Sequence, residues 1–138
     1  MPRPWLLPLA GLATTAMALT VSAQDAKLQR GKYLAEEVAR CQECHTPTID
    51  VGQFDKAQWM KGAPVIGVPA TPVKDWHDKA PDLTSTSKLW ERWGMDGFVK
   101  FLRTSKNPKG NQAGPPMPAY TLKAEDAEAI AAYLKSLP

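Results

Sequence analysis

The 138-residue sequence predicts one all-α domain, built from three main helices and long proline-rich loops. Three segments repeat apolar residues at the i, i+3, i+4, i+7 spacing of an amphipathic helix. Most of the 13 prolines fall between these segments, and strand and helix patterns do not alternate along the chain. The sequence therefore predicts helices connected by loops, with too little regular structure for an ordinary hydrophobic core.

An N-terminal secretory signal peptide is predicted over residues 1–23. Residues 5–24 carry no charged side chain, and the small-x-Ala pattern of residues 21–23 is typical of a cleavage site. We expect cleavage to leave a mature chain of residues 24–138, a single domain in a bacterial periplasm. A membrane anchor is the alternative, which the proline, glycine and threonine residues within the run disfavour. No other apolar run approaches spanning length, so we expect no transmembrane segment in the mature chain.

The three helices are predicted from their apolar stripes. The first covers residues 25–40, with Asp25 in position to cap its N-terminus. The second starts near Gly94, and its stripe includes Met95, which we therefore expect in the core. The third covers residues 123–137. In chain order the stripe residues are Gly31, Leu34, Ala35, Val38, Met95, Phe98, Val99, Leu102, Ala127, Ile130, Ala131 and Leu134.

Two proline-rich connections separate the helices, residues 46–84 and residues 104–120. Short helical turns fit residues 55–60 and 87–93. The second connection cannot form a regular helix or a central strand, because proline lacks the N–H group that both require. Loops of this length in a compact domain need something that organises them, and a large prosthetic group would do so.

Cys41, Cys44 and His45 form the pattern C-x-x-C-H, by which haem c is attached. Two thiols one helical turn apart can each form a thioether with a haem vinyl group, and the following imidazole can bind the iron. No other cysteines are present, which excludes a scaffold of several disulfides and a four-cysteine zinc site. A zinc site completed by His77, a thioredoxin-type redox pair and a local disulfide are the alternatives. The spacing and the export signal together favour haem.

The haem iron needs a sixth ligand from elsewhere in the chain. Met117 is the preferred candidate, because the prolines around it restrict its loop and lower the entropy cost of holding one side chain at the iron. His77 is the runner-up, since imidazole is the better ligand but its surroundings are less constrained. Met60 and Met95 are weaker candidates, the first because it follows His45 too closely and the second because it belongs to an apolar stripe.

The order of helix, C-x-x-C-H motif, long loop, helix, methionine loop and C-terminal helix resembles that of class I c-type cytochromes. The resemblance covers residues 25–138, essentially the whole mature chain. It implies a cytochrome c-like fold around one haem c, bound covalently through Cys41 and Cys44. It also implies that His45 and Met117 are the two axial ligands of the iron.

The resemblance implies three further contacts. The first and last helices should cross, with Gly31 against Tyr133. The proximal histidine should donate a hydrogen bond from the N–H of its second ring nitrogen to a proline carbonyl, for which Pro64 is the candidate. Related proteins often cap the last helix with serine or threonine where this chain has Lys123, and we expect Thr121 to take that role.

Residues 61–64 (Lys-Gly-Ala-Pro) and 80–84 (Ala-Pro-Asp-Leu-Thr) are similar to segments of single-haem periplasmic cytochromes that serve bacterial dehydrogenases. The resemblance implies a one-electron carrier and not an enzyme, with a dehydrogenase as donor and an oxidase or another cytochrome as acceptor. A net charge of +3 gives little support for nucleic-acid binding. Two alternatives stay open: a haem enzyme or gas sensor with an open sixth iron position, and a cytochrome subunit permanently bound to a dehydrogenase.

Several large side chains are expected near the cofactor without a specific role. Arg103 could pair with a haem propionate, but its phase on the second helix favours a solvated face. The tryptophans after the signal peptide are expected to pack at the haem edge, to donate an indole N–H to a propionate, or to be buried around the cofactor: Trp59, Trp76, Trp90 and Trp93.

We predict that the protein recovered from the periplasm of a bacterial host has the mass of residues 24–138 alone. The reason is that a signal peptidase recognises the small residues at the end of the apolar run. Intact-mass spectrometry measures the cleavage point directly. A mass that still includes residues 1–23 would contradict both the processing and the expected compartment.

Overall fold

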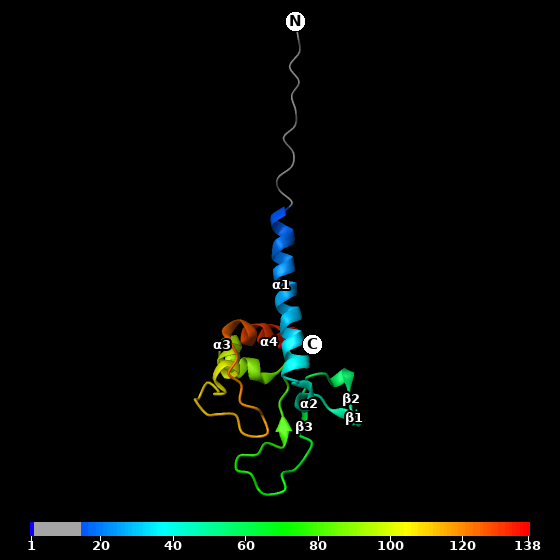
Figure 1. Cartoon of the computed structure of the whole chain (residues 1–138), viewed down its shortest axis with the longest axis vertical. Helices are drawn as coiled ribbons and strands as arrows, with labels where there is room; N and C mark the ends of the chain where they lie inside the picture. The colour runs from blue at the N-terminus through cyan, green and yellow to red at the C-terminus, as the bar shows by residue number, and fades with distance from the viewer. Residues whose placement is uncertain (2–14) are drawn as a thin grey trace.

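Helices make up most of the regular structure, as the sequence predicts (Figure 1). The computed structural model describes the backbone of Met1 and residues 15–138, and the side chains of Met1 and residues 23–138, so most of the expected signal peptide lies outside the described residues. Among the described residues, no helix is long and apolar enough to cross a membrane. The helical elements are α1 (Thr15–Tyr33), the π-helical turn η1 (Leu34–Val38), α2 (Gln42–His45), the 3₁₀ turn η2 (Lys56–Gln58), α3 (Lys88–Thr104) and α4 (Ala124–Ser136).

Short antiparallel ladders lie within residues 46–84, where the sequence predicts loop. β1 (Thr48–Asp50) pairs with β2 (Gln53–Phe54), and β3 (Ala63–Pro64) pairs with β4 (Lys79–Ala80). Strands of two or three residues are too short to produce a detectable alternation in the sequence. They shape the loop without adding a layer to the domain, so the all-α prediction is confirmed.

α4 crosses the C-terminal part of α1, which brings the two ends of the domain together (Figure 1). Gly31 lies at this crossing. A Cβ atom on Gly31 would overlap the carbonyl group of Ala129 and lie 2.8 Å from Cβ of Tyr133. The predicted contact between Gly31 and Tyr133 is confirmed, and only glycine lets the helices approach this closely. Two exposed ion pairs flank the crossing and contribute little stability, Arg30–Asp126 and Lys27–Glu128.

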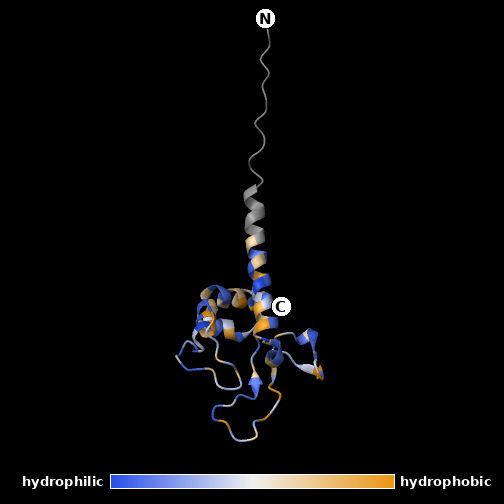
Figure 2. Ribbon diagram, viewed as in Figure 1, coloured by the Kyte–Doolittle hydropathy of each residue, from blue (hydrophilic) through white to orange (hydrophobic). Residues whose placement is uncertain are grey.

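The hydrophobic core forms where η1, α3 and α4 meet. Hydrophobic and hydrophilic residues both run along α3 and α4, as expected of amphipathic helices (Figure 2). Met60, for which the sequence indicates no special setting, is completely buried in this core. The predicted stripe residues that are buried are Gly31, Ala35, Phe98, Leu102, Ala127, Ile130, Ala131 and Leu134.

The predicted start of the first helix is wrong. α1 begins at Thr15, so Asp25 lies inside the helix and does not cap it. The ten residues before Asp25 include no glycine or proline, and nothing there stops the helix. The helix ends in η1, whose wider turn ends at Val38, two residues earlier than predicted.

The second predicted helix and the turn before it belong to one interrupted helix. α3 starts at Lys88, where the Ser87 hydroxyl caps it by accepting the Leu89 N–H at 3.1 Å. Gly94 breaks the helical geometry with φ 64° and ψ −179°. The expectation that Met95 lies in the core is wrong, since Met95 is 37% exposed in the first turn after this break.

The last helix agrees with the prediction in extent but not in its cap. α4 covers Ala124–Ser136, and its N-cap residue is Lys123, which makes no side-chain hydrogen bond to the helix. Thr121 is therefore not the cap that the sequence analysis expected. Glu125 and Asp126 lie in the first turn, where negative charge interacts favourably with the helix dipole.

We predict that Gly31→Ala lowers the free energy of unfolding by roughly 2 kcal/mol, because the helices must separate to make room for the Cβ. Denaturant unfolding of the purified protein measures this. Arg30→Ala is the matched control on the same turn. It removes only an exposed ion pair, so it should cost less than about 1 kcal/mol. Equal losses in the two variants would contradict the proposed close contact.

Candidate functional site

A cavity of about 340 Å³ opens between the C-x-x-C-H motif, α3, α4 and the proline-rich loops. Cys41, Cys44 and His45 line it from one side, and Met117 also lines it. A cavity with a mainly apolar lining and few polar groups is typical of a cofactor site. Its leucine, isoleucine, phenylalanine and tryptophan lining residues are Leu83, Leu89, Trp93, Phe98, Phe101, Leu102, Leu122, Ile130 and Leu134.

The motif forms a single helical turn that presents both cysteines to the cavity. The N–H of His45 donates to the carbonyl of Cys41 at 2.9 Å, which closes the turn. The two thiols are free and partly buried. Burial raises the pKa of Cys41 to about 11 and also raises the pKa of Cys44, so both are neutral thiols at neutral pH. Neutral thiols beside an apolar cavity fit thioether attachment better than binding of a zinc ion as thiolates.

His45 is held as a neutral imidazole in a defined orientation. Its side chain is only 4% exposed, and Nδ1 donates to the carbonyl of Pro81 at 2.7 Å. Because a carbonyl only accepts, the proton is assigned to Nδ1, and Nε2 keeps its lone pair for a metal. Burial lowers the pKa of His45, against the smaller opposite effect of the carbonyl. An imidazole held in this way fits the proximal ligand of a haem iron.

The expectation that Pro64 accepts this hydrogen bond is wrong. Pro64 lies in β3 and pairs with Lys79 of β4, with its side chain exposed. The chain then continues from β4 to Pro81, which reaches the imidazole ring. Two proline-containing segments follow the motif, and the sequence alone does not say which of them passes under His45.

The loop that carries Met117 is anchored at both ends. The backbone N–H of His77 donates to the carbonyl of Pro115 at 2.8 Å. The hydroxyl of Tyr120 donates to the carbonyl of Ala39, next to the motif, at 3.1 Å. These bonds keep Met117 beside the cavity, where its side chain is half-buried.

The four candidate sixth ligands fall into two groups. Met117 and His77 both line the cavity that His45 lines. Met60 and Met95 do not, because Met60 is buried elsewhere in the core and Met95 lies at the surface. The choice of Met117 as the iron ligand stays a prediction, with His77 as the alternative.

Two cationic residues of the site were missed by the sequence analysis. Lys79 and Arg92 are the charged residues that line the cavity in the described part of the chain, and both are positive. They fit the two propionate carboxylates of a haem, because a mainly apolar cavity that takes up anions needs cations at its lining. Arg103, which the sequence analysis considered for this role, is exposed and does not line the cavity. No sequence signal distinguishes Arg92, since the break at Gly94 interrupts the periodicity beside it.

The tryptophans have different surroundings. Trp93 lines the cavity, and Trp90 is buried next to it, where its indole N–H donates to the carbonyl of Thr84 at 2.7 Å. Trp59 and Trp76 do not line the cavity. Ordinary burial is therefore observed for Trp90, and packing of Trp93 against a bound haem stays a prediction.

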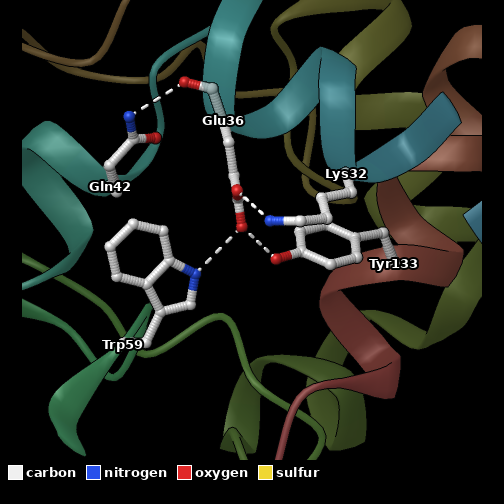
Figure 3. Close-up of polar contacts among 5 residues, drawn as sticks. All are labelled: Lys32, Glu36, Gln42, Trp59 and Tyr133. Carbon is white, nitrogen blue, oxygen red and sulfur yellow. Dashed lines mark hydrogen bonds and ion pairs between the residues drawn. The ribbon is translucent and has the colours of Figure 1, made fainter. Parts of the chain in front are cut away.

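A polar cluster around Glu36 holds the motif against α4 (Figure 3). The Glu36 carboxylate accepts hydrogen bonds from the Trp59 indole at 3.1 Å, the Tyr133 hydroxyl and the Lys32 ammonium. The side chain of Gln42, inside the motif, donates to the backbone carbonyl of Glu36 at 2.8 Å. The cluster therefore connects η1, the motif, α4 and the long loop at one point.

The ionisation of Glu36 depends on these contacts. Burial raises the pKa of its carboxyl, but the hydrogen bonds that it accepts, first from Lys32 and then from Tyr133, lower the pKa by more in total. The net result is a pKa below the ordinary value. The carboxylate therefore stabilises the folded state at neutral pH, and this contribution is lost as the pH falls below about 4.5 through the lowered value.

Comparison with known proteins agrees with this arrangement. The sequence model of the cytochrome c family matches residues 28–138. A diheme cytochrome c-type protein of Cereibacter sphaeroides is 34% identical over 115 residues, which is 80% of this chain and 35% of that protein. The fructose dehydrogenase cytochrome subunit of Gluconobacter japonicus is 30% identical over 79% of this chain and 22% of its own length. The cytochrome c subunit of the quinone alcohol dehydrogenase of Gluconobacter oxydans is 32% identical, over 85% and 25%. The chain thus spans about a third or less of these relatives.

We predict that Glu36→Gln lowers the free energy of unfolding at pH 7 by about 1–3 kcal/mol, because it removes the charge from three hydrogen bonds. The loss should shrink as the pH falls through the lowered pKa of the wild-type carboxyl, because that carboxyl is then protonated as well. Denaturant unfolding across this pH range is the measurement. Glu37→Gln, a change at an exposed position of the same turn, should have little effect at any pH. A Glu36→Gln loss that does not shrink as the wild-type carboxyl becomes protonated would exclude the charge as its cause.

Proposed function

The chain belongs to the cytochrome c family, and on this basis we propose that it is a periplasmic one-electron carrier with His45 and Met117 as iron ligands. Its haem c is attached covalently through Cys41 and Cys44. When bound, the haem iron supplies reversible exchange of one electron. The residues of the chain hold the cofactor, orient its ligands and keep water away from it.

The observation that carries this proposal is that His45 and Met117 line one apolar cavity. The hydrogen bond from His45 to Pro81 supports a basic, correctly oriented imidazole. A methionine thioether is a soft ligand that favours Fe(II), and an imidazole–thioether pair is associated with a high reduction potential. An iron held by both His45 and Met117 would suit electron transfer rather than chemistry on a bound substrate.

The partners are proposed from the relatives. Two of the similar proteins are cytochrome subunits of dehydrogenases that act on fructose and on alcohols. We propose that a dehydrogenase is the electron donor of this chain, and that an oxidase or another cytochrome is the acceptor. A free carrier and a permanently bound subunit share this chemistry and differ in the lifetime of the complex, so co-purification with a dehydrogenase separates them.

The compartment is proposed from the sequence of residues 1–23. In the full chain α1 runs through the expected cleavage point after Ala23. Cleavage there would leave Gly31 and the ion-pairing residues Lys27 and Arg30 in place, so the crossing with α4 does not depend on the removed part.

We predict that Met117→Ala abolishes the thioether-to-iron charge-transfer band of the ferric protein and lowers its midpoint potential. The variant should also bind carbon monoxide in the ferrous state, because its sixth position is then open. Visible spectroscopy and a redox titration measure these properties. Met95→Ala, at an exposed methionine outside the cavity, is the control and should keep the band.

Other results would change the assignment. A charge-transfer band that survives in Met117→Ala would show that another residue is the ligand. If His77→Ala then alters the spectrum, the iron has two imidazole ligands and its expected potential is lower. Carbon monoxide binding by the unaltered protein would favour the haem enzyme or gas sensor over the carrier.

A further inference from the structure

Residues 61–64, the Lys-Gly-Ala-Pro segment, lie between the motif and the segment that contains Pro81. None of the four residues lines the cavity. The segment nevertheless contacts both sides of the His45–Pro81 hydrogen bond. The N–H of Gly62 donates to the backbone carbonyl of His45 at 2.8 Å, and β3 pairs with β4 immediately before Pro81.

Gly62 touches the Pro81 peptide directly. A Cβ atom on Gly62 would lie 2.8 Å from the carbonyl oxygen of Ala80 and 2.9 Å from both the Pro81 carbonyl carbon and the Asp82 nitrogen. These separations are shorter than any ordinary contact of a Cβ atom. Gly62 also has φ +84°, in the left-handed region that other residues rarely adopt. The backbone at this point is therefore built for a residue without a side chain.

From these contacts we propose that Gly62 is a positioning residue for His45: it sets where the Pro81 carbonyl lies and so the strength of the hydrogen bond to the imidazole. The proposal rests on His45 as the proximal ligand, as given under the proposed function. It also gives the Lys-Gly-Ala-Pro segment a role other than the one expected for it, in which the Pro64 carbonyl accepts the hydrogen bond from His45.

Hydrogen bonds on both sides of residues 60–62 hold these residues in register with the motif and with the Pro81 segment. The N–H of Met60 donates to the hydroxyl of Thr46, next to His45, at 2.9 Å, and the N–H of Leu83 donates to the carbonyl of Met60 at 2.9 Å. Residues 60–62 are thus bonded to the motif on one side and to the Pro81 segment on the other. A displacement at residue 62 is therefore passed to Pro81.

The Pro81 segment has little freedom to absorb such a displacement. On its far side, the Ser87 hydroxyl donates to the carbonyl of Asp82 at 2.6 Å, and the Trp90 indole donates to the carbonyl of Thr84 at 2.7 Å. Both donors belong to the start of α3. A side chain on Gly62 would therefore push against a backbone that the start of α3 holds in place. The distance that can change is the one between His45 and the Pro81 carbonyl.

A weaker hydrogen bond to Pro81 has a defined consequence at the iron. A carbonyl that accepts a hydrogen bond from the Nδ1–H group makes the imidazole a more basic ligand. A more basic ligand stabilises the ferric state of the iron relative to the ferrous state. Moving the acceptor away should therefore raise the midpoint potential. It should also let the Nδ1 proton exchange faster with solvent, by about tenfold for the loss of one hydrogen bond.

The test compares Gly62→Ala with Gly67→Ala in the holoprotein. Gly67 has φ +98° and no atom within 4 Å of its Cβ position, so its variant reproduces the backbone strain without the contact. We expect Gly62→Ala to raise the midpoint potential and to speed exchange of the His45 Nδ1 proton, followed by NMR of the reduced protein. Gly67→Ala should leave both unchanged. Equal values in the two variants would overturn the proposal.

Two further variants separate the possible causes. Gly62→Asn keeps the Cβ contact but tolerates the left-handed backbone, so it should behave as Gly62→Ala does, and a return to the wild-type potential would refute the contact. If neither Gly62 variant accumulates with haem attached, Thr46→Val decides. This variant removes the acceptor of the Met60 N–H and so loosens residues 60–62 without adding an atom at residue 62. We expect a smaller rise in midpoint potential, and an unchanged potential overturns the proposal. A wild-type protein without a haem-bound His45 would instead refute the proposed function.

Discussion

The hydrogen bond from His45 to the carbonyl of Pro81 joins two parts of the chain that lie 36 residues apart, and much of the site is arranged around it. It fixes the imidazole proton on Nδ1 and leaves Nε2 available to a metal. It also requires the long connection of residues 46–84 to return to the motif, which the β3–β4 ladder allows. Soon after Pro81 the chain enters α3, so the same contact helps to place the helix that carries Arg92 beside the motif.

The cavity beside this bond combines properties that a protein interior rarely combines. Its lining is mainly apolar, yet it includes a neutral imidazole, a thioether and two cations from separate elements. An apolar surrounding disfavours a change in net charge, and the cations Lys79 and Arg92 offset the negative charge that a haem carries at its edge. The site thus meets the two requirements of an electron carrier, which are a buried redox centre and balanced charge around it.

The parts that the sequence predicts are those set by local pattern. The C-x-x-C-H motif, the three helices and the contact of Gly31 with Tyr133 all follow from spacing or from family resemblance, and the structure agrees with them. The errors concern choices between similar segments. Pro81 rather than Pro64 meets His45, and that choice depends on the two-residue strands β3 and β4, which leave no periodic signal. Arg92 was missed for a related reason, because one glycine beside it interrupts the helix.

The crossing of α1 with α4 has a consequence for the order in which the molecule folds. Arg30 and Asp126, which pair at this crossing, are 96 residues apart in the chain. Closing so long a loop has a large entropy cost and slows folding, and it requires the C-terminal helix to be present. α4 (Ala124–Ser136) follows α1 by about 90 residues, so α1 has no docking site until α4 has been synthesised.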